Sequence, residues 1–498
     1  MKNVFRSLFF FMSVAFVFQS CEEQHDNEVP SDIAINNFVW KGLNLYYLWQ
    51  AGVPNLSDSR FSNQNQLNNF LYGYSLPETL FQDLLDKPIS KFPNPEEAKD
   101  RFSVIFSDYN QLEGILSGTT KNNGIEYGLY YKNTTGNQVF GVVRYILPNS
   151  DAASKNIARG AIFYAVDGIP LMGSRGNINA NNLKELLGKN VTYTLNFADY
   201  DAGDITPNGQ SLIVTKTTLS ENPVYITTVI NSGTHKIGYL MYNGFYPNYE
   251  DQLNTAFGNL KAVGITELVL DLRYNSGGSI ATATRLASMI TGQYTGQVFA
   301  TEQWNAKVEA YYNANNPGTL INLFENKTNT NATINSLNLT KVYVLTTKST
   351  ASASELVING LEPYINVIQI GDKTTGKNVG SITLYDSPTF SKKDSSNKHR
   401  YAMQPLVLKI VNKVGFGDYS NGLEPDELLK ENLSNLGILG DPNEPLLNAA
   451  VTRIIGGGRM LPINPEKTFE TIQDNQPSNQ LKNEMYLETL PEGLHLIK

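Results

Sequence analysis

Between Ser31 and about Gly118, apolar side chains recur every three or four positions, the period of a helix with one buried face. Further helical runs are expected over 63–71 and 79–85. The dense aromatic residues here are more typical of a core than of a ligand platform. We therefore predict a helical N-terminal cap over residues 31–118. The apolar positions that define its first helix are Ile35, Phe38, Val39, Leu43, Tyr46 and Tyr47, with Ser31 or Asp32 as the cap.

The pattern changes to short alternating runs between residues 119 and 218, which predicts a β-rich domain. Strands are expected over 127–131, 138–145, 160–170, 191–197 and 211–216, and short helices within 148–154 and 182–187. Gly and Asn-rich turns separate these runs.

Strands and helices then alternate in a third region, for which we predict an α/β domain over residues 219–460. Its strands are expected over 236–242, 267–273 and 342–346, and its helices over 249–260, 280–290 and 355–361. This order favours parallel βαβ units. Residues 292–339 are rich in Asn, Thr and Gly and are interpreted as an elaborated loop. The C-terminal tail, 461–498, is expected to lie on the surface or to be partly loose.

Composition excludes several classes of function. The 498 residues are 41% hydrophobic, enough for large cores, and carry a net charge of −8 with no basic run, so a nucleic-acid partner is not expected. The four His residues are not spaced as metal ligands. We therefore predict no metal and no cofactor. The sequence makes no prediction of oligomeric state.

The N-terminus predicts export. A short basic region precedes an apolar run, 8–18, that is too short to span a bilayer and fits a signal peptide over 1–20. Cys21, the only cysteine, follows a small residue, as in a bacterial lipobox. We expect cleavage before Cys21, a lipid anchor on it, and a tether over 21–30. The protein would be an outer-membrane lipoprotein of the cell envelope, periplasmic or surface-exposed. An ordinary signal peptide with an incidental Cys is the alternative, and the acidic tether is either an export signal or a plain linker.

The strongest chemical candidates are Ser352 and Lys377, 25 positions apart (377 − 352). Ser352 falls between a predicted strand and a predicted helix, where backbone N–H groups and the positive end of the helix dipole can stabilise an oxyanion. A Ser hydroxyl needs a base, and a desolvated neutral Lys can serve as one. A Ser/Thr-rich helix cap with a solvent-exposed Lys is the alternative.

Four segments carry a family resemblance: Thr350-Ala-Ser-Ala-Ser-Glu355, Gly371-Asp-Lys-Thr-Thr-Gly-Lys377, Leu268-Val-Leu-Asp-Leu-Arg273 with Asn275-Ser-Gly-Gly278, and Gly422-Leu-Glu-Pro-Asp426. Together they resemble the carboxyl-terminal-processing (tail-specific) serine proteases over roughly residues 102–426. The resemblance implies a multidomain α/β protein with a crotonase-like or Clp-like catalytic core and an inserted PDZ-like domain. It also implies a Ser/Lys dyad that cleaves protein or peptide substrates.

The resemblance also implies roles around the dyad. Gly277, with Gly278 as second choice, would supply one oxyanion donor and the Ala353 N–H the other; a turn that merely packs is the alternative. Many relatives carry a Gln four positions after the Lys, where this chain has Ser381 as the candidate third catalytic residue. Asp271 and Arg273 are interpreted as a structural salt bridge, and Glu355 as a helix cap.

The β-rich region, 119–218, resembles a PDZ domain, which binds an extended peptide at a sheet edge. Gly124, Tyr127 and Gly128 are the candidate peptide-binding residues. They depart from the usual Gly-Leu-Gly-Phe loop, so a structural or autoregulatory role stays open.

Three hypotheses follow. The first, which we favour, is a Ser/Lys endopeptidase acting outside the cytoplasm. The second is a crotonase-fold surface lipoprotein that has lost proteolysis and binds peptides or other ligands. The third is a scaffold that works through its PDZ-like domain. Cleavage of casein or a tailed peptide, compared with Ser352→Ala, separates the first from the others.

Overall fold

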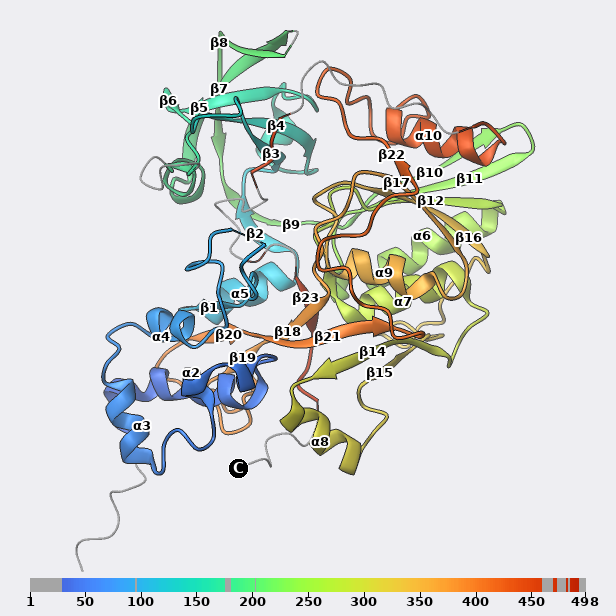
Figure 1. Cartoon of the computed structure of the whole chain (residues 1–498). Coiled ribbons are helices and arrows are strands. Elements are labelled where there is room, and N and C mark those ends of the chain that lie inside the picture. Colours follow the sequence, from blue (N-terminus) through green and yellow to red (C-terminus); the bar gives the residue numbers. More distant parts are fainter. Residues whose placement is uncertain are drawn as a thin grey trace, which may run out of the picture. The chain divides into compact units, whose positions relative to one another are not determined.

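The structure is a computed structural model that describes residues 29–94, 96–174, 181–201, 203–458, 469–472, 481 and 484–491. The predicted signal peptide, Cys21 and most of the tether lie outside the described residues. The chain forms two compact units, one up to Arg101 and one from Phe102 onward (Figure 1). Within the described ranges, no helix is long and apolar enough to cross a membrane.

The first unit is helical, as predicted. It contains α2 (Ala34–Tyr46), α3 (Gln64–Leu71) and α4 (Pro77–Asp83). Asn63 begins α3 by accepting a hydrogen bond from Gln66 N, and Pro77 begins α4 in the first turn, where no N–H is needed. The unit ends at Arg101 and not at residue 118, because β1 (Val104–Phe106) and α5 (Tyr109–Leu116) belong to the second unit.

An antiparallel sheet, here called the small sheet, accounts for the β-rich region. Its strands lie in the order β3 (Ile125–Tyr131), β4 (Val139–Ile146), β5 (Ile162–Val166), β7 (Thr192–Asp201) and β8 (Asp204–Thr215), and β6 (Ile169–Pro170) pairs with β5. The helix expected at 182–187 is a π-helix, Lys184–Lys189. The chain enters this region through β2 (Thr119–Asn122) and leaves it through β9 (Thr217–Ser220), and these two strands pair as an antiparallel ribbon. The small sheet is therefore an insertion.

The main sheet confirms the predicted parallel βαβ units. Its order is β10 (Val224–Ser232), β11 (His235–Tyr242), β12 (Glu267–Asp271), β16 (Lys341–Thr346), β17 (Asn366–Gly371) and β22 (Glu427–Leu428), and all pairs from β11 onward are parallel. Helices α6 (Glu250–Val263), α7 (Ile280–Thr291) and α9 (Ala353–Leu361) cover one face, and α10 (Pro445–Ile454) covers the other (Figure 1).

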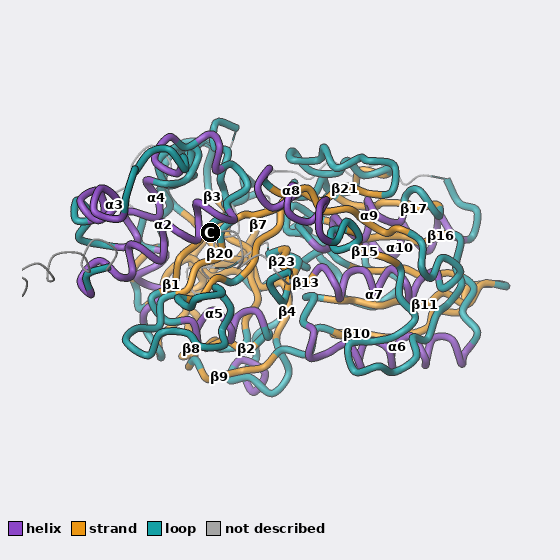
Figure 2. Tube along the Cα trace, turned by 90° about the horizontal axis from the view of Figure 1, so that it is seen from below, coloured by secondary structure: helices purple, strands orange, loops and turns teal. Residues whose placement is uncertain are grey.

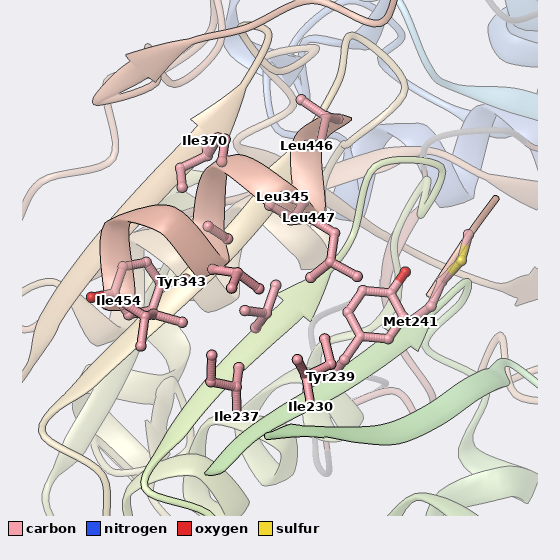
Figure 3. Close-up of a cluster of buried hydrophobic side chains, with 14 of the residues drawn as sticks. Ile230, Ile237, Tyr239, Met241, Tyr343, Leu345, Ile370, Leu446, Leu447 and Ile454 are labelled. Carbon is pink, nitrogen blue, oxygen red and sulfur yellow. The ribbon is translucent and has the colours of Figure 1, made fainter. Parts of the chain in front are cut away.

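The core under α10 is built from alternate strand residues and the apolar face of that helix. Figure 3 shows Ile237, Tyr239 and Met241 of β11 beside Leu446 and Leu447 of α10. All five are at most 1% exposed. Every second side chain of the strands thus packs against the apolar face of the helix. This packing fixes the register of the strands, and therefore where each strand ends.

A second sheet packs against α7 and α9 from the side away from the main sheet. Its order is β13 (Gly278–Ser279), β23 (Met485–Leu487), β18 (Val379–Ile382), β21 (Leu406–Asn412), β14 (Val298–Trp304) and β15 (Ile321–Leu323). Figure 2 labels β13 and β23 next to each other, to the left of α7.

Two predictions about loops are wrong. Residues 292–339 are not simply an elaborated loop, because β14, α8 (Ala306–Asn315) and β15 form within them. The tail does not lie on the surface along its whole length. Met485 is fully buried in β23, since the tail brings one short apolar run, 485–487, into the middle of the second sheet.

Candidate active site

Three turns meet at the carboxyl edge of the parallel strands β12, β16 and β17. Thr350 Oγ1 donates to Leu272 O at 2.8 Å, and Ala351 N donates to Asn275 O at 3.1 Å. Thr375 N in turn donates to Thr350 O at 3.0 Å. The turns after all three strands are therefore tied together, as expected where parallel strands end side by side.

Ser352 lies at the N-cap of α9 in a conformation that L-residues rarely adopt, with φ +65° and ψ −116°. Such backbone strain persists only where the surroundings hold it, and it is concentrated at functional sites. The side chain is fully buried, and its Oγ has no hydrogen-bond partner among the described residues. Ser354 Oγ donates to Asn275 O, and Ser349 Oγ accepts from Arg144 Nη2. Of these three serines, Ser352 is the one whose hydroxyl is not engaged within the described chain.

Glu355 holds the segments of Ser352 and Lys377 together. Its Oε2 accepts from Ser352 N at 2.7 Å and from Lys377 N at 2.9 Å. Its Oε1 accepts from Gly376 N at 2.7 Å and from Thr374 Oγ1 at 2.5 Å. Burial raises the pKa of Glu355, and these donors oppose that rise. A helix cap, the role inferred from the sequence, is only part of what this carboxylate does.

The Gly277–Gly278 turn faces Ser352. Gly277 has φ +113°, and a Cβ there would lie 2.7 Å from Ser352 Cβ and 3.1 Å from Ala353 N, which leaves room for glycine alone. Gly277 N donates to Asn275 Oδ1 at 2.9 Å, whereas Gly278 N donates to the carbonyl oxygen of Glu484. The geometry therefore favours Gly278, the second choice, as the candidate oxyanion donor, because its N–H already points at a carbonyl oxygen.

Lys377 is fully buried, as a lysine base must be to lose its proton near neutral pH. Its Nζ lies 3.4 Å from Glu484 Oε2 and 4.8 Å from the centre of the Phe102 ring. Ser381 Oγ donates to the same Glu484 oxygen at 3.0 Å. Lys377 and Ser381 are thus brought together through Glu484, a residue that sequence reasoning missed. The only signal for it was the short apolar run that follows in an otherwise polar tail.

The structure places the other predicted residues apart from this cluster. Gly124 turns the chain before β3 with φ +89°, and Tyr127 is buried in the core of the small sheet. Gly128 lies within β3 opposite Val142, with the Arg144 guanidinium over it. Gly124 thus precedes the edge strand β3, and Tyr127 and Gly128 lie within it. Cys21 lies outside the described residues.

The small sheet nevertheless touches the site directly. Arg144 of β4 donates to Ser349 Oγ at 2.8 Å and lies over the Tyr274 ring, 4.8 Å from its centre. Arg159 donates to Tyr274 Oη at 2.7 Å and to Glu431 at 2.6 Å. Glu431 also accepts from Arg273. The observed Asp271–Arg273 salt bridge, with both side chains fully buried, extends this network as predicted.

A serine at a strained strand-to-helix turn, whose backbone is tied through Glu355 to that of a buried lysine, fits the arrangement of a serine hydrolase. Residues 236–387 match the model of peptidase family S41, and residues 34–104 match that of the peptidase S41 N-terminal domain. These two matches, to the S41 peptidase domain and to its N-terminal domain, support the carboxyl-terminal-processing protease family, and the protein is a serine peptidase.

Relatives extend the match over most of the chain. A carboxyl-terminal-processing protease from Picosynechococcus sp. is 24% identical over 74% of this chain and 76% of its own length. A protease of the same description from Synechocystis sp. is 22% identical over 82% of this chain and 86% of its own. The crystal structure of a proposed S41 protease from Bacteroides fragilis covers 84% of this chain and 97% of its own, with 26% identity and a TM-score of 0.61.

Proposed function

We propose that this chain is an endopeptidase in which Ser352 and Lys377 form a catalytic dyad that hydrolyses peptide bonds in proteins or peptides outside the cytoplasm. The observation that carries the proposal is Glu355 Oε2, which binds the backbone nitrogens of both residues and so fixes their separation. The strained backbone of Ser352 and the full burial of Lys377 support it.

The reaction follows from these positions. Neutral Lys377 Nζ takes the proton of Ser352 Oγ as that oxygen bonds to the scissile carbonyl carbon. The N–H groups of Gly278 and Ala353 stabilise the charge on the carbonyl oxygen. The C–N bond breaks, the lysine returns its proton to the leaving amine, and an acyl-enzyme on Ser352 remains. Water, deprotonated by Lys377, then releases the acid and restores the serine. Ser381 is proposed to orient the lysine amine.

The surrounding domains are proposed to serve this reaction. The main sheet with α6, α7, α9 and the second sheet supports a crotonase-like or Clp-like core. The insertion of the small sheet through the β2–β9 ribbon, with β3 at its edge, supports a PDZ-like domain that receives extended peptides. A lipid on Cys21 would hold the enzyme on the outer membrane, where unfolded or tailed envelope proteins are the substrates.

The test is cleavage of casein or a tailed peptide by the form that begins after Cys21. Ser352→Ala is expected to abolish cleavage while leaving the thermal unfolding midpoint in place. Ser349→Ala and Ser354→Ala are matched controls, because they remove hydroxyls of the same turn that are already engaged; both should retain most of the activity. Cleavage by Ser352→Ala at the wild-type rate would refute the assignment.

A further inference from the structure

The C-terminal segment 484–488, here called the tail strand, occupies the candidate active site. Met485 and Tyr486 pair in parallel with Gly278 and Ser279 of β13. On the other side, Tyr486 and Leu487 pair with Ser381 and Ile382 of β18. The tail strand therefore fills a gap between two strands that both carry predicted catalytic residues.

The backbone carbonyl and the side-chain carboxylate of Glu484 both contact candidate catalytic residues. Its carbonyl oxygen accepts from Gly278 N, the oxyanion donor that the geometry favours. A Cβ on Gly277 would lie 2.3 Å from that carbonyl oxygen and 2.7 Å from Ser352 Cβ, so the carbonyl lies beside the nucleophile. Its carboxylate meets Lys377 Nζ and Ser381 Oγ. A strand with a purely structural role requires none of these contacts.

The same tail also binds the small sheet 12 residues earlier (484 − 472). Tyr131 N donates to Glu470 O, and Ile472 N donates to Leu129 O, both at 2.9 Å, which adds an antiparallel segment to the edge strand β3. The Phe469 ring packs on Phe140 with 5.0 Å between ring centres. Addition to a sheet edge is how PDZ-type domains hold an extended peptide.

We propose, resting on the function proposed above, that the tail is a built-in pseudosubstrate. Its described parts occupy two places where an extended polypeptide substrate would bind: 469–472 at the β3 edge, and 484–488 between β13 and β18. The segment 484–488 must leave its place before cleavage. The Glu484 carboxylate also engages Lys377 Nζ, so the amine is not available to Ser352 while the tail strand is docked.

The kinetic test uses Glu484→Gln in the form that begins after Cys21. Glutamine keeps the shape of the side chain and removes the charge that pairs with Lys377, so the tail strand is released more readily. Casein cleavage should become faster by about tenfold, the equivalent of ~1.4 kcal/mol of lost docking. Glu96→Gln, at an exposed position of the first unit, should match wild type. A slower Glu484→Gln enzyme would overturn the proposal, because Glu484 would then assist the reaction.

A binding test does not depend on catalysis. A labelled synthetic peptide of residues 481–491 is titrated, by fluorescence anisotropy, into Ser352→Ala and into Ser352→Ala/Glu484→Gln. The protein's own tail strand is tethered and competes with the peptide at high effective concentration. Weaker docking of that strand should therefore tighten peptide binding by about tenfold. Equal affinities, or binding to neither form, would overturn the pseudosubstrate. If no form cleaves casein but the affinities differ as expected, the dyad fails and the pseudosubstrate stands.

Discussion

Glu355 Oε1 and Oε2 each accept two hydrogen bonds, from donors on both sides of the site. A glutamine there would turn one of these acceptors into an NH₂ group that faces two donors. Glu355→Gln should therefore be nearly as damaging as Glu355→Ala, because buried donors left without a partner cost about 1–3 kcal/mol each. We expect both variants to lower the free energy of unfolding in urea by roughly 2–4 kcal/mol and to lose peptidase activity.

Glu113→Gln is a control for that experiment. Glu113 is a partly exposed carboxylate that contacts Lys392 and Tyr385 and none of the residues bound to Glu355. It should change the free energy of unfolding by less than about 1 kcal/mol. Full activity and stability in Glu355→Gln would show that this carboxylate does not assemble the site.

Lys377 is the residue whose charge state the proposed mechanism depends on. Lys377→Arg should be as inactive as Lys377→Ala, because a guanidinium stays protonated at every pH at which the enzyme folds. We expect kcat/KM to fall by roughly 10²- to 10⁴-fold, the usual contribution of a general base. In wild type, kcat/KM should rise with pH as the lysine loses its proton. Turnover by Lys377→Arg, or a rate that falls with rising pH across this limb, contradicts its role as base.

Among elements, the Glu431 carboxylate is one of the groups that join the small sheet to the main sheet. Burial disfavours the ionised form of Glu431, but Arg159 and Arg273, with a hydrogen bond from Tyr274, outweigh it and lower its pKa from 4.5 to about 2. Because the folded-state pKa lies below the unfolded one, the ionised group stabilises the fold above pH ~4.5. This stabilisation, about 3 kcal/mol, is lost as the pH falls through about 2.

Glu431→Gln should accordingly lower the free energy of unfolding at pH 7 and flatten its decline between pH 4.5 and 2.5, as measured by chemical denaturation. Glu424→Gln, which removes an exposed carboxylate paired with Lys373, is the control and should follow wild type. An acid decline in Glu431→Gln that is as steep as in wild type would assign the acid sensitivity to other groups.

Elements with strong periodicity were predictable from sequence alone. The parallel strands β11, β12 and β16, and the helices between them, follow from apolar runs bounded by turn residues, and this order also placed Ser352 and the Gly277–Gly278 turn at one edge of the sheet. The position of β23 was not predictable. A three-residue apolar run carries too little signal, and its pairing with β13 depends on contacts about 200 residues away in sequence. The hydrogen bonds to Glu355 were not predictable for the same reason. Three of its four donors, on Thr374, Gly376 and Lys377, belong to another segment that only folding brings close.

For the molecule as a whole, the proposed location rests on a lipid anchor at Cys21. Cys21→Ser should release the protein from the membrane or mis-sort it, without loss of activity, because a lipid chain contributes ~0.8 kcal/mol per buried CH₂ and no other cysteine can carry it. Mass spectrometry of the mature N-terminus and detergent-phase partitioning measure this. An unmodified N-terminus that begins at another residue would indicate a soluble periplasmic enzyme.

The central claim, a nucleophile activated by a lysine, is tested most directly by covalent labelling. A fluorophosphonate probe added to the folded protein should modify Ser352, as located by peptide mass spectrometry, and the labelling rate should collapse in Lys377→Ala. Labelling of Ser349, Ser354 or another serine in place of Ser352, or an unchanged rate at Ser352 without Lys377, would contradict the Ser/Lys dyad.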